Sequence, residues 1–426
     1  MNFSPKAILV SLLFLSVPAL THAQEAPPQN QPVALTDLLT EAERTNPQIQ
    51  AARHGWDSAK QVPTQVSTLP DPQFVLQHLS VGSPRPFSGY TNSDFAYVGV
   101  GVSQDLPYPG KLRLRGEVAK KDADVTQQKY ESVRRAILAE VKMAYFQLGY
   151  LAKRQAILEG DGKLLQQVEQ SADARYQSGM GNQQDVLQAQ LERTKLLREI
   201  TMNQLEAGKV EAGIKQLLNR PQSSPDIETI ELSETVVTYT YDQLLAAANV
   251  NNPDIAGSQK MIERQGLQVD LAKKDFYPDF NLQYMWQRTD PTQFRAYYVV
   301  TLGVRIPIYR GRRQQPELAQ AEADQSRAKS DHEAQTQQTG FQLRQQFLGA
   351  EKSAELLKIY REGLIPQARV ELQAGMAAYQ SNRQDFQALL ASFLDVLKLD
   401  EEYWQTLSEH ETALAQLEAV TGLSLR

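Results

Sequence analysis

The sequence has 426 residues, no cysteine, a formal net charge of −6 at pH 7 and a mean hydropathy of −0.46. The absence of cysteine excludes disulfides, thiol catalysis, thiolate metal sites and a lipid-modified N-terminal cysteine. The mildly acidic balance argues against nucleic acid as a partner.

The first residues have the pattern of an export signal. Lys6 supplies a positive charge, residues 7–20 form an apolar run, and small residues at 21–23 suit cleavage. We expect a signal peptide over 1–23 and an extended, proline-rich N-terminal arm over 24–34. No later apolar stretch approaches the ~20 residues of a spanning helix. A mature chain that crosses a membrane is therefore expected to do so with β-strands closed into a barrel.

The rest of the chain repeats itself. Two sets of matching segments are Asn46-Pro47 with Asn252-Pro253, and Tyr176-Gln177-Ser178 with Tyr379-Gln380-Ser381. A period of roughly 200 residues indicates a duplicated domain and not a solenoid of short units. The sequence predicts a first repeat over 35–220, a linker over 221–240 and a second repeat over 241–422, and each repeat is expected to begin with short helices.

Each repeat contains segments with the two-residue period of a β-strand. In the first repeat, Val98, Val100 and Val102 alternate with glycine and serine. The pattern predicts one β-hairpin over 72–106 and another over 279–306. Strands of about ten residues with one apolar and one polar face are typical of a membrane barrel with a wet lumen. Each strand alone would also fit an ordinary soluble hairpin.

After each hairpin the apolar period changes to about 3.5 residues. The pattern predicts two helix pairs, 111–178 with 184–219 and 316–380 with 385–422. Such lengths exceed those of ordinary globular helices and are typical of coiled coils. Pro366 predicts a kink or a break within the third of these helices.

Prolines and glycines mark the points where strand must become helix. The predicted strand-to-helix junction residues are Pro107, Gly110, Pro307 and Gly311. Proline stops a strand ladder and can start a helix, and glycine permits a sharp change of direction. We expect these residues to have a structural role and no chemistry.

Four strands are too few to close a barrel, and an open sheet edge in lipid leaves backbone groups without partners. Two copies would supply eight strands around a packed interior, and three would supply twelve around a lumen. Small residues on the predicted inner face, such as Gly99, Gly101 and Gly303, favour the lumen. The sequence thus predicts a mixed α and β membrane protein. In this homotrimer, four transmembrane strands per protomer form a β-barrel that long antiparallel coiled-coil helix hairpins continue as an α-helical barrel.

The repeated order of short helices, hairpin and long helix pair resembles the TolC family of outer-membrane efflux proteins over nearly all of the predicted mature chain. The matching motifs are Asn46-Pro47, Asn252-Pro253, Tyr176 to Gly179 with Asp185 to Leu187, Tyr379 with Asp385-Phe386, and Tyr277-Pro278-Asp279. The stretch from Gln104 to Leu112 resembles the CzcC/CusC-like branch that serves heavy-metal efflux pumps. The resemblance implies a passive exit duct in the cell outer membrane that extends into the periplasm and serves metal or drug resistance. It also implies three partners, which are a periplasmic adaptor (membrane fusion) protein, an inner-membrane pump of the RND type, and outer-membrane lipid.

The resemblance further implies a periplasmic tip that opens and closes. The tip turns expected to contact the adaptor contain Gly179, Gly181 and Asn382. The closing network maps to Tyr379, Asp185 and Arg383, and Asp385 matches an acidic ring that faces the pore. An alternative interpretation is that both aspartates are simply helix N-caps, although capping does not exclude gating.

No catalytic, cofactor-binding or metal site is predicted. The five histidines lack the spacing of metal ligands. We expect Glu401-Glu402 and Glu409-His410-Glu411 to be solvated helix faces. Two alternatives come from other classes of protein: a periplasmic coiled-coil adaptor or scaffold of an export system, and an enzyme with a coiled-coil insert. The sequence leaves a metal cation, a drug and other compounds open as the substrate.

Overall fold

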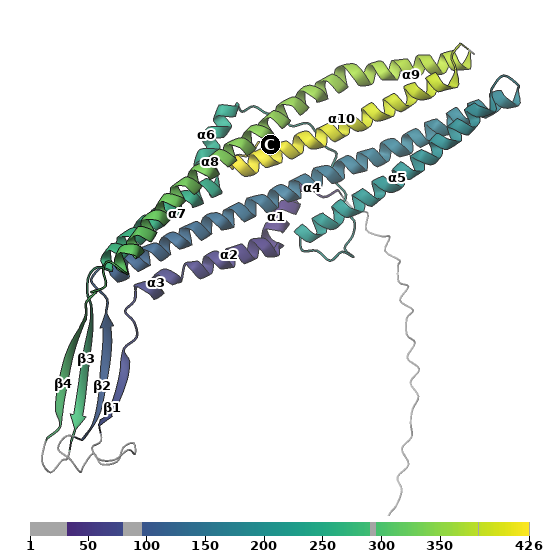
Figure 1. The fold of residues 1–426 in the computed structure, drawn as a ribbon. Helices are drawn as coiled ribbons and strands as arrows, with labels where there is room; N and C mark the ends of the chain where they lie inside the picture. The colour runs from purple at the N-terminus through teal and green to yellow at the C-terminus, as the bar shows by residue number, and fades with distance from the viewer. Residues whose placement is uncertain (1–31, 80–95, 290–294, 382, 426) are drawn as a thin grey trace, which may run out of the picture.

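The structure is a computed structural model that describes residues 32–79, 96–289, 295–381 and 383–425. The predicted signal peptide, most of the predicted N-terminal arm, the loops within the two hairpins and Asn382 lie outside these residues. The molecule is elongated, with a small sheet at one end and two long helical hairpins that extend side by side from it (Figure 1).

Short helices begin both halves of the chain and pack along the long ones. They are α1 (Leu35–Thr45), α2 (Pro47–Ala59) and α3 (Val62–Ser67) in the first half, and α6 (Tyr241–Asn251) and α7 (Pro253–Lys274) in the second. The side-chain oxygens of Asn46 and Asn252 each accept two backbone N–H groups and cap the next helix. Their amide groups donate to the carbonyls of Leu217 and Val420. Each asparagine therefore ties a short helix to the end of a long one.

The two hairpins form one antiparallel sheet. Its strands are β1 (Gln73–Leu79), β2 (Tyr97–Leu106), β3 (Asp279–Arg288) and β4 (Tyr297–Arg305), in the order β1-β2-β3-β4. The two halves of the chain join where β2 pairs with β3, and there Val100 lies opposite Trp286. Strands β1 and β4 form the two edges of the sheet.

Two long hairpins make up the helical rod. In the first, α4 (Lys111–Gln177) returns as α5 (Gln183–Leu217). In the second, α8 (Gln314–Ile359), a π-helical turn (Tyr360–Leu364) and α9 (Ile365–Gln380) return as α10 (Phe386–Thr421). Buried residues recur every seven positions on α4, at Leu151, Leu158, Leu165 and Ala172. A seven-residue apolar repeat is the pattern of a left-handed coiled coil.

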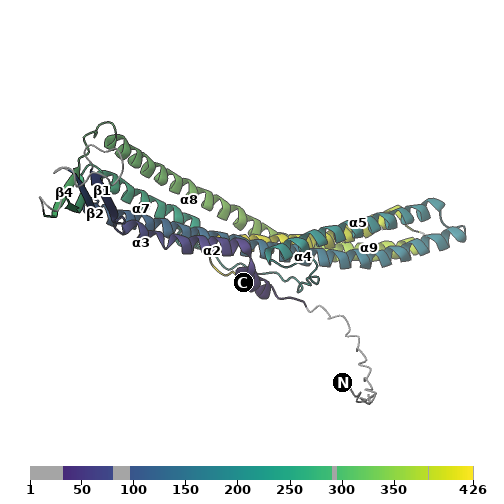
Figure 2. The same cartoon turned by 90° about the horizontal axis from the view of Figure 1, so that it is seen from below.

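The helix breaks near Pro366, as the sequence predicts, and the break takes the form of the π-helical turn just before this proline. Pro366 has no N–H to donate to the carbonyl of Glu362, so the ordinary α-helical bond is lost. The N–H of Ile365 instead bonds the carbonyl of Tyr360, five residues back. Helices α8 and α9 run in different directions on the two sides of this turn (Figure 2).

The core is a series of apolar clusters along the rod. The middle cluster includes Leu38, Val141, Ile214, Leu357 and Leu407. The cluster near the tip includes Leu158, Leu165, Leu372, Phe386 and Phe393. A third cluster, including Leu244, Leu343 and Leu414, joins α6 to α8 and α10. Burial of these side chains stabilises the rod at intervals along its length.

Candidate functional site

The sheet exposes a continuous apolar face. Its residues are Phe74, Leu76, Val100, Val102, Leu282, Tyr284, Trp286, Tyr298, Val300, Leu302 and Val304, all exposed. The strand register places them on one side, since Val100 lies opposite Trp286 and Trp286 lies opposite Tyr298. Apolar patches of this extent are rare on soluble monomers and mark contact with a membrane or a partner.

The opposite face of the sheet is mostly polar or small, with Val75, Met285 and Val299 as its apolar members. The amide of Asn281 donates to the hydroxyl of Ser103 at 3.0 Å and to Asp105 Oδ1 at 2.9 Å. Beside this network, Met285 packs over Gly101, where a Cβ atom would lie 2.9 Å from the Met285 Cα atom. Glycine is therefore required for this close approach.

The two edges of the sheet are unprotected within the described residues, since β1 and β4 each pair with one strand only. Among the same residues, no helix combines the length and the apolar character needed to cross a membrane. An exposed apolar face with open edges is a template for pairing with another chain.

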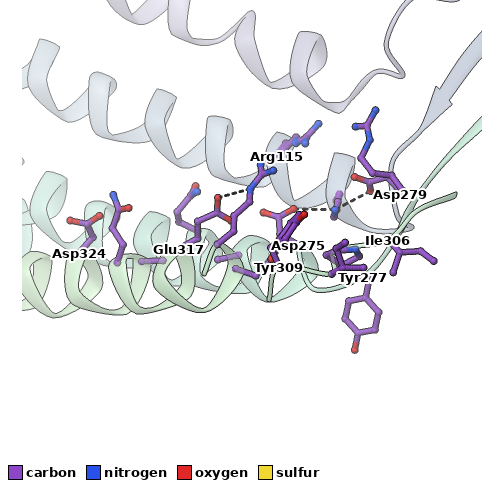
Figure 3. Close-up of a pocket in the computed structure, with 18 residues that line it drawn as sticks. Arg115, Asp275, Tyr277, Asp279, Ile306, Tyr309, Glu317 and Asp324 are labelled. Atoms are coloured by element: carbon purple, nitrogen blue, oxygen red, sulfur yellow. Dashed lines mark hydrogen bonds and ion pairs between the residues drawn. The ribbon is translucent and has the colours of Figure 1, made fainter. Parts of the chain in front are cut away.

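The first strand-to-helix junction, between β2 and α4, is stabilised by ion pairs. Gly110 adopts φ +94° and starts α4. The N–H of Tyr108 donates to Asp279 Oδ1 at 2.8 Å. Lys111 is only 3% exposed, and its Nζ lies 2.9 Å from Asp279 and 3.0 Å from Asp275. These ion pairs border a cavity of about 700 Å³ between α4, α7 and the start of α8 (Figure 3).

The second junction, between β4 and α8, is an exposed turn. The N–H of Ile308 bonds the carbonyl of Ile306 around Pro307, and the N–H groups of Arg312 and Arg313 bond the carbonyl of Tyr309. Gly311 lies in this turn but does not adopt a left-handed φ, and a Cβ atom there would meet open space. The change of direction does not depend on glycine at this junction.

At the opposite end of the molecule, the first tip turn folds α4 back into α5. Gly179 has φ +73°, and the N–H groups of Met180 and Gly181 bond the carbonyl of Arg175. Asn182, and not Asp185, caps α5 by accepting the N–H of Gln184. The N-cap interpretation is thus wrong for Asp185, which lies one residue after Gln184 in the first turn of α5.

In the second tip turn, Asp385 caps α10 and accepts the N–H of Ala388 at 2.8 Å. The N-cap interpretation is right for this exposed residue. The backbone N–H of Arg383 bonds the carbonyl of Ala378 at 2.8 Å. Within the described residues, the side chain of Arg383 makes no hydrogen bond or ion pair.

Tyr379 lies buried between the two turns. Arg175 of the first hairpin donates to its carbonyl and holds a guanidinium 4.5 Å from the centre of its ring. Phe386 meets the same ring edge-on at 5.9 Å. Burial raises the pKa of Tyr379, Arg175 opposes this, and Asp185 adds to it. The structure thus brings Tyr379 together with Arg175, and Asp185 is near enough to affect the pKa of Tyr379. Arg383 joins this region only through its backbone N–H, since within the described residues its side chain makes no hydrogen bond or ion pair.

Arg175 is a residue that the sequence analysis missed. It immediately precedes the repeated segment Tyr176-Gln177-Ser178, and the second copy has Ala378 at the same place. This asymmetry between the copies is the only signal in the sequence, because the contact with Tyr379 joins positions 204 residues apart.

The expectation that Glu409-His410-Glu411 is a solvated face is wrong for two of its three residues. His410 and Glu411 are buried. The carboxylate of Glu411 accepts the N–H and the hydroxyl of Thr235, and His410 Nε2 lies 2.9 Å from the carbonyl of Thr235. The segment before α6 therefore lies against α10 at mid-length, which the pattern of a single helix cannot reveal.

Comparison with known proteins identifies the family. The model of the outer membrane efflux protein family matches residues 38–220 and 244–422. The chain belongs to this family. The family resemblance stated from the sequence is confirmed, and the chain is an outer-membrane protein.

Curated relatives of this efflux-family chain are similar over part of their length. The multidrug resistance outer membrane protein MdtQ of Escherichia coli O6:H1 is 23% identical over 316 residues, which is 68% of this chain. A putative protein of the same name from Shigella flexneri has the same identity and coverage. The chain spans 65% of the length of these relatives.

Solved structures share the fold. The outer-membrane channel OprN has a TM-score of 0.78 at 17% identity and covers 92% of this chain and 90% of its own. VceC of Vibrio cholerae has a TM-score of 0.78 at 17% identity, with 92% and 97% covered. CusC has a TM-score of 0.77 at 16% identity, with 94% and 95% covered. The predicted fold class is confirmed.

Proposed function

We propose that this efflux-family chain is one protomer of a homotrimeric exit duct, which passively conducts substrate from the periplasm to the exterior as part of a tripartite efflux pump. The observation that carries the proposal is the sheet, which has one exposed apolar face, one polar face and two open edges. Its neighbours by fold include proteins described as outer-membrane channels. They favour a duct over the alternative of a periplasmic adaptor or scaffold.

The open edges support an assembly of three copies. The edge strand β4 of one copy would pair with β1 of the next, so three copies of four strands would close a wall of twelve. Closure satisfies every edge N–H and C=O group, each of which costs several kcal/mol in lipid without a partner. The face that carries Gly99 and Gly101 would line the lumen. The two repeats, 35–220 and 241–422 joined by the linker 221–240, would each supply one hairpin of strands and one hairpin of helices.

The tip supplies the partner surface and the gate in this proposal. Met180 and the turn around Gly179 and Gly181 are exposed at the end of the first hairpin, where a periplasmic adaptor and, through it, an inner-membrane pump of the RND type would meet the duct. The contact of Arg175 with Tyr379 would hold the two hairpins together in the closed state. Opening would break that contact while the coiled coil repacks.

The pump would choose the substrate, because a duct distinguishes size and charge only loosely. The MdtQ relatives are named for multidrug resistance, and the Pro107 to Lys111 stretch resembles the heavy-metal branch. A drug and a metal cation are therefore the two substrate classes to test, by complementation of strains that lack the outer-membrane component of each type of pump.

Reconstitution in a planar lipid bilayer tests the duct itself. The purified full-length chain is expected to run as a detergent-resistant trimer and to give discrete conductance steps. A second preparation with Thr301→Arg, at an exposed position of β4 on the proposed lumen face, should change the unit conductance or its ion selectivity. A water-soluble monomer, or a membrane-bound oligomer without conductance, would overturn the proposal. Either result would favour the alternative function of a periplasmic adaptor or scaffold.

A further inference from the structure

The second strand-to-helix junction combines positive charge with exposed apolar groups. We call residues 305–313 the β4–α8 turn. It contains four arginines and no acidic residue, in the sequence Arg-Ile-Pro-Ile-Tyr-Arg-Gly-Arg-Arg. Ile306, Ile308 and Tyr309 in the same turn are 61%, 72% and 69% exposed. Side chains of these types rarely share an exposed turn unless something covers them.

The apolar residues continue the apolar face of the sheet. Ile306 is the next residue in the alternating row that runs through Val300, Leu302 and Val304 of β4. Tyr309, Tyr277 and Ile306 all line the cavity beside α8 (Figure 3). Tyrosine rings at the end of an apolar band are typical of the boundary between hydrocarbon and headgroups. The β4–α8 turn therefore lies at the membrane boundary nearest the helices.

The arginines of the turn are open to a ligand. Arg310 and Arg312 are exposed and, within the described residues, make no ion pair. Arg313 reaches Glu317 at 3.2 Å, but its side chain is 73% exposed. Arg305 lies opposite Asp279 in the strand register. At least two cations in this turn are therefore uncompensated.

We propose that the β4–α8 turn binds the headgroups of anionic phospholipids. Ile306, Ile308 and Tyr309 would enter the boundary of the acyl chains, while Arg310 and Arg312 would donate to headgroup phosphates. Guanidinium groups bind phosphate with two N–H donors, and basic clusters next to an apolar membrane segment attract anionic lipid. This proposal needs only the membrane location and does not depend on what the duct carries.

A neighbouring copy fits this turn less well. In the assembly proposed above, β4 pairs with β1, so the chain before β1 would come nearest to the β4–α8 turn. That segment, Leu69-Pro70-Asp71-Pro72, carries a single acidic residue against four arginines. The charges match the phosphate groups of a lipid surface better than they match this segment.

Native mass spectrometry of the full-length protein tests the proposal. The protein is released from mixed micelles that contain equal amounts of phosphatidylethanolamine and cardiolipin, and the retained lipid is counted. Wild-type protein is expected to retain cardiolipin preferentially. In the Arg310→Gln/Arg312→Gln variant, the ratio of retained cardiolipin to retained phosphatidylethanolamine should be about 30-fold lower than in the wild type. Each arginine near an anionic surface contributes about 1 kcal/mol to binding.

The matched control is Arg113→Gln/Arg327→Gln, which removes two exposed arginines that already have partners, Glu117 and Asp324. It should retain cardiolipin as the wild type does. Unchanged retention in the β4–α8 variant, or an equal loss in the control, would overturn the proposal. Dissociation of the variant's oligomer in both lipids would also overturn it, because that result assigns the turn to a neighbouring copy. The conductance of the channel is a separate readout, so failure of the duct proposal would leave this result interpretable.

Discussion

The two strand-to-helix junctions have the same place in the duplicated chain and opposite surroundings. At the first, Lys111 is buried between Asp275 and Asp279. At the second, the β4–α8 turn is exposed, and among the described residues Arg313 alone of its four arginines makes an ion pair. The duplication kept the path of the chain and not the environment of its side chains. The β2–α4 junction links the sheet to the helices through buried ion pairs. The β4–α8 junction exposes its side chains to whatever surrounds the protein.

The strongest test of this difference is the removal of one charge at each junction. Lys111→Met should destabilise the protein by about 2–3 kcal/mol, because it leaves two carboxylates without their buried cation. The figure lies below that for a fully buried pair because Asp275 and Asp279 are 40% and 30% exposed. Guanidinium unfolding of the protein in detergent, followed by circular dichroism, measures the change.

The control for this variant is Arg313→Met, which breaks an exposed pair with Glu317 and should cost less than about 0.5 kcal/mol. Equal losses in the free energy of unfolding would show that solvent weakens the Lys111 ion pairs as much as it weakens the exposed Arg313 pair. The two junctions would then not differ in their electrostatics.

The glycines of the two junctions give the next largest expected effect. Gly110→Ala should destabilise the protein by about 1–2 kcal/mol, because its φ of +94° is unfavourable for a residue with a Cβ atom. Gly311→Ala should be neutral or stabilising by up to about 1 kcal/mol, since it has an ordinary φ and open space around it. Thermal unfolding of both variants measures the difference, and a reversed order would refute the assignment of strain to Gly110.

The two halves of the chain also differ at the tip. The first helical hairpin contributes Arg175 and the second contributes Tyr379. Arg175→Gln removes a cation–π contact of about 0.5–2 kcal/mol and a bond to the Tyr379 carbonyl, which corresponds to a several-fold shift toward the open state. Single-channel recording should show a higher open probability.

Arg383→Gln is the matched control at the tip, since the Arg383 side chain makes no ion pair within the described residues. It should leave the open probability unchanged. A larger effect for Arg383 than for Arg175 would restore the network inferred from the family resemblance.

The smallest expected effect is a pH dependence at Asp161 on α4. Burial, with Asp400 and Glu401 nearby, raises the pKa of Asp161 to about 6, and Arg369 on α9 opposes the rise. The folded state therefore binds this proton more tightly than the unfolded state does. The residue costs stability above about pH 6, and this cost disappears as the pH falls toward the unfolded value of 3.8.

Asp161→Asn should accordingly stabilise the protein at pH 7.5 by at most about 1 kcal/mol, because the carboxyl is partly exposed. The advantage should vanish near pH 4. Unfolding midpoints of the variant and the wild type across this range test the sign, and an advantage that grows on acidification would contradict it.

Patterns of side chains along one segment were readable from the sequence. The change of period from two to about 3.5 separated the strands from the helices, and Pro366 located the break. Contacts between distant segments were not readable. The burial of Lys111 depends on two aspartates more than 160 positions away, Arg175 meets Tyr379 from the other repeat, and His410 is covered by the segment around Thr235. Each needs the packing of separate elements, which no local periodicity encodes.

The π-helical turn keeps the apolar stripe of the second hairpin in phase. Leu343, Ala350 and Leu357 on α8 are spaced by seven, as are Leu372 and Tyr379 on α9, and all are buried. The step from Leu357 to Leu372 is one residue longer than two heptads, and the wide turn between them absorbs that residue. Deleting one residue from Tyr360–Leu364 should therefore preserve the stripe, although Pro366 would still leave one α-helical bond unmade. Adding one elsewhere on α9 would rotate Tyr379 by about 100° away from Arg175 and disconnect the tip from the rest of the rod.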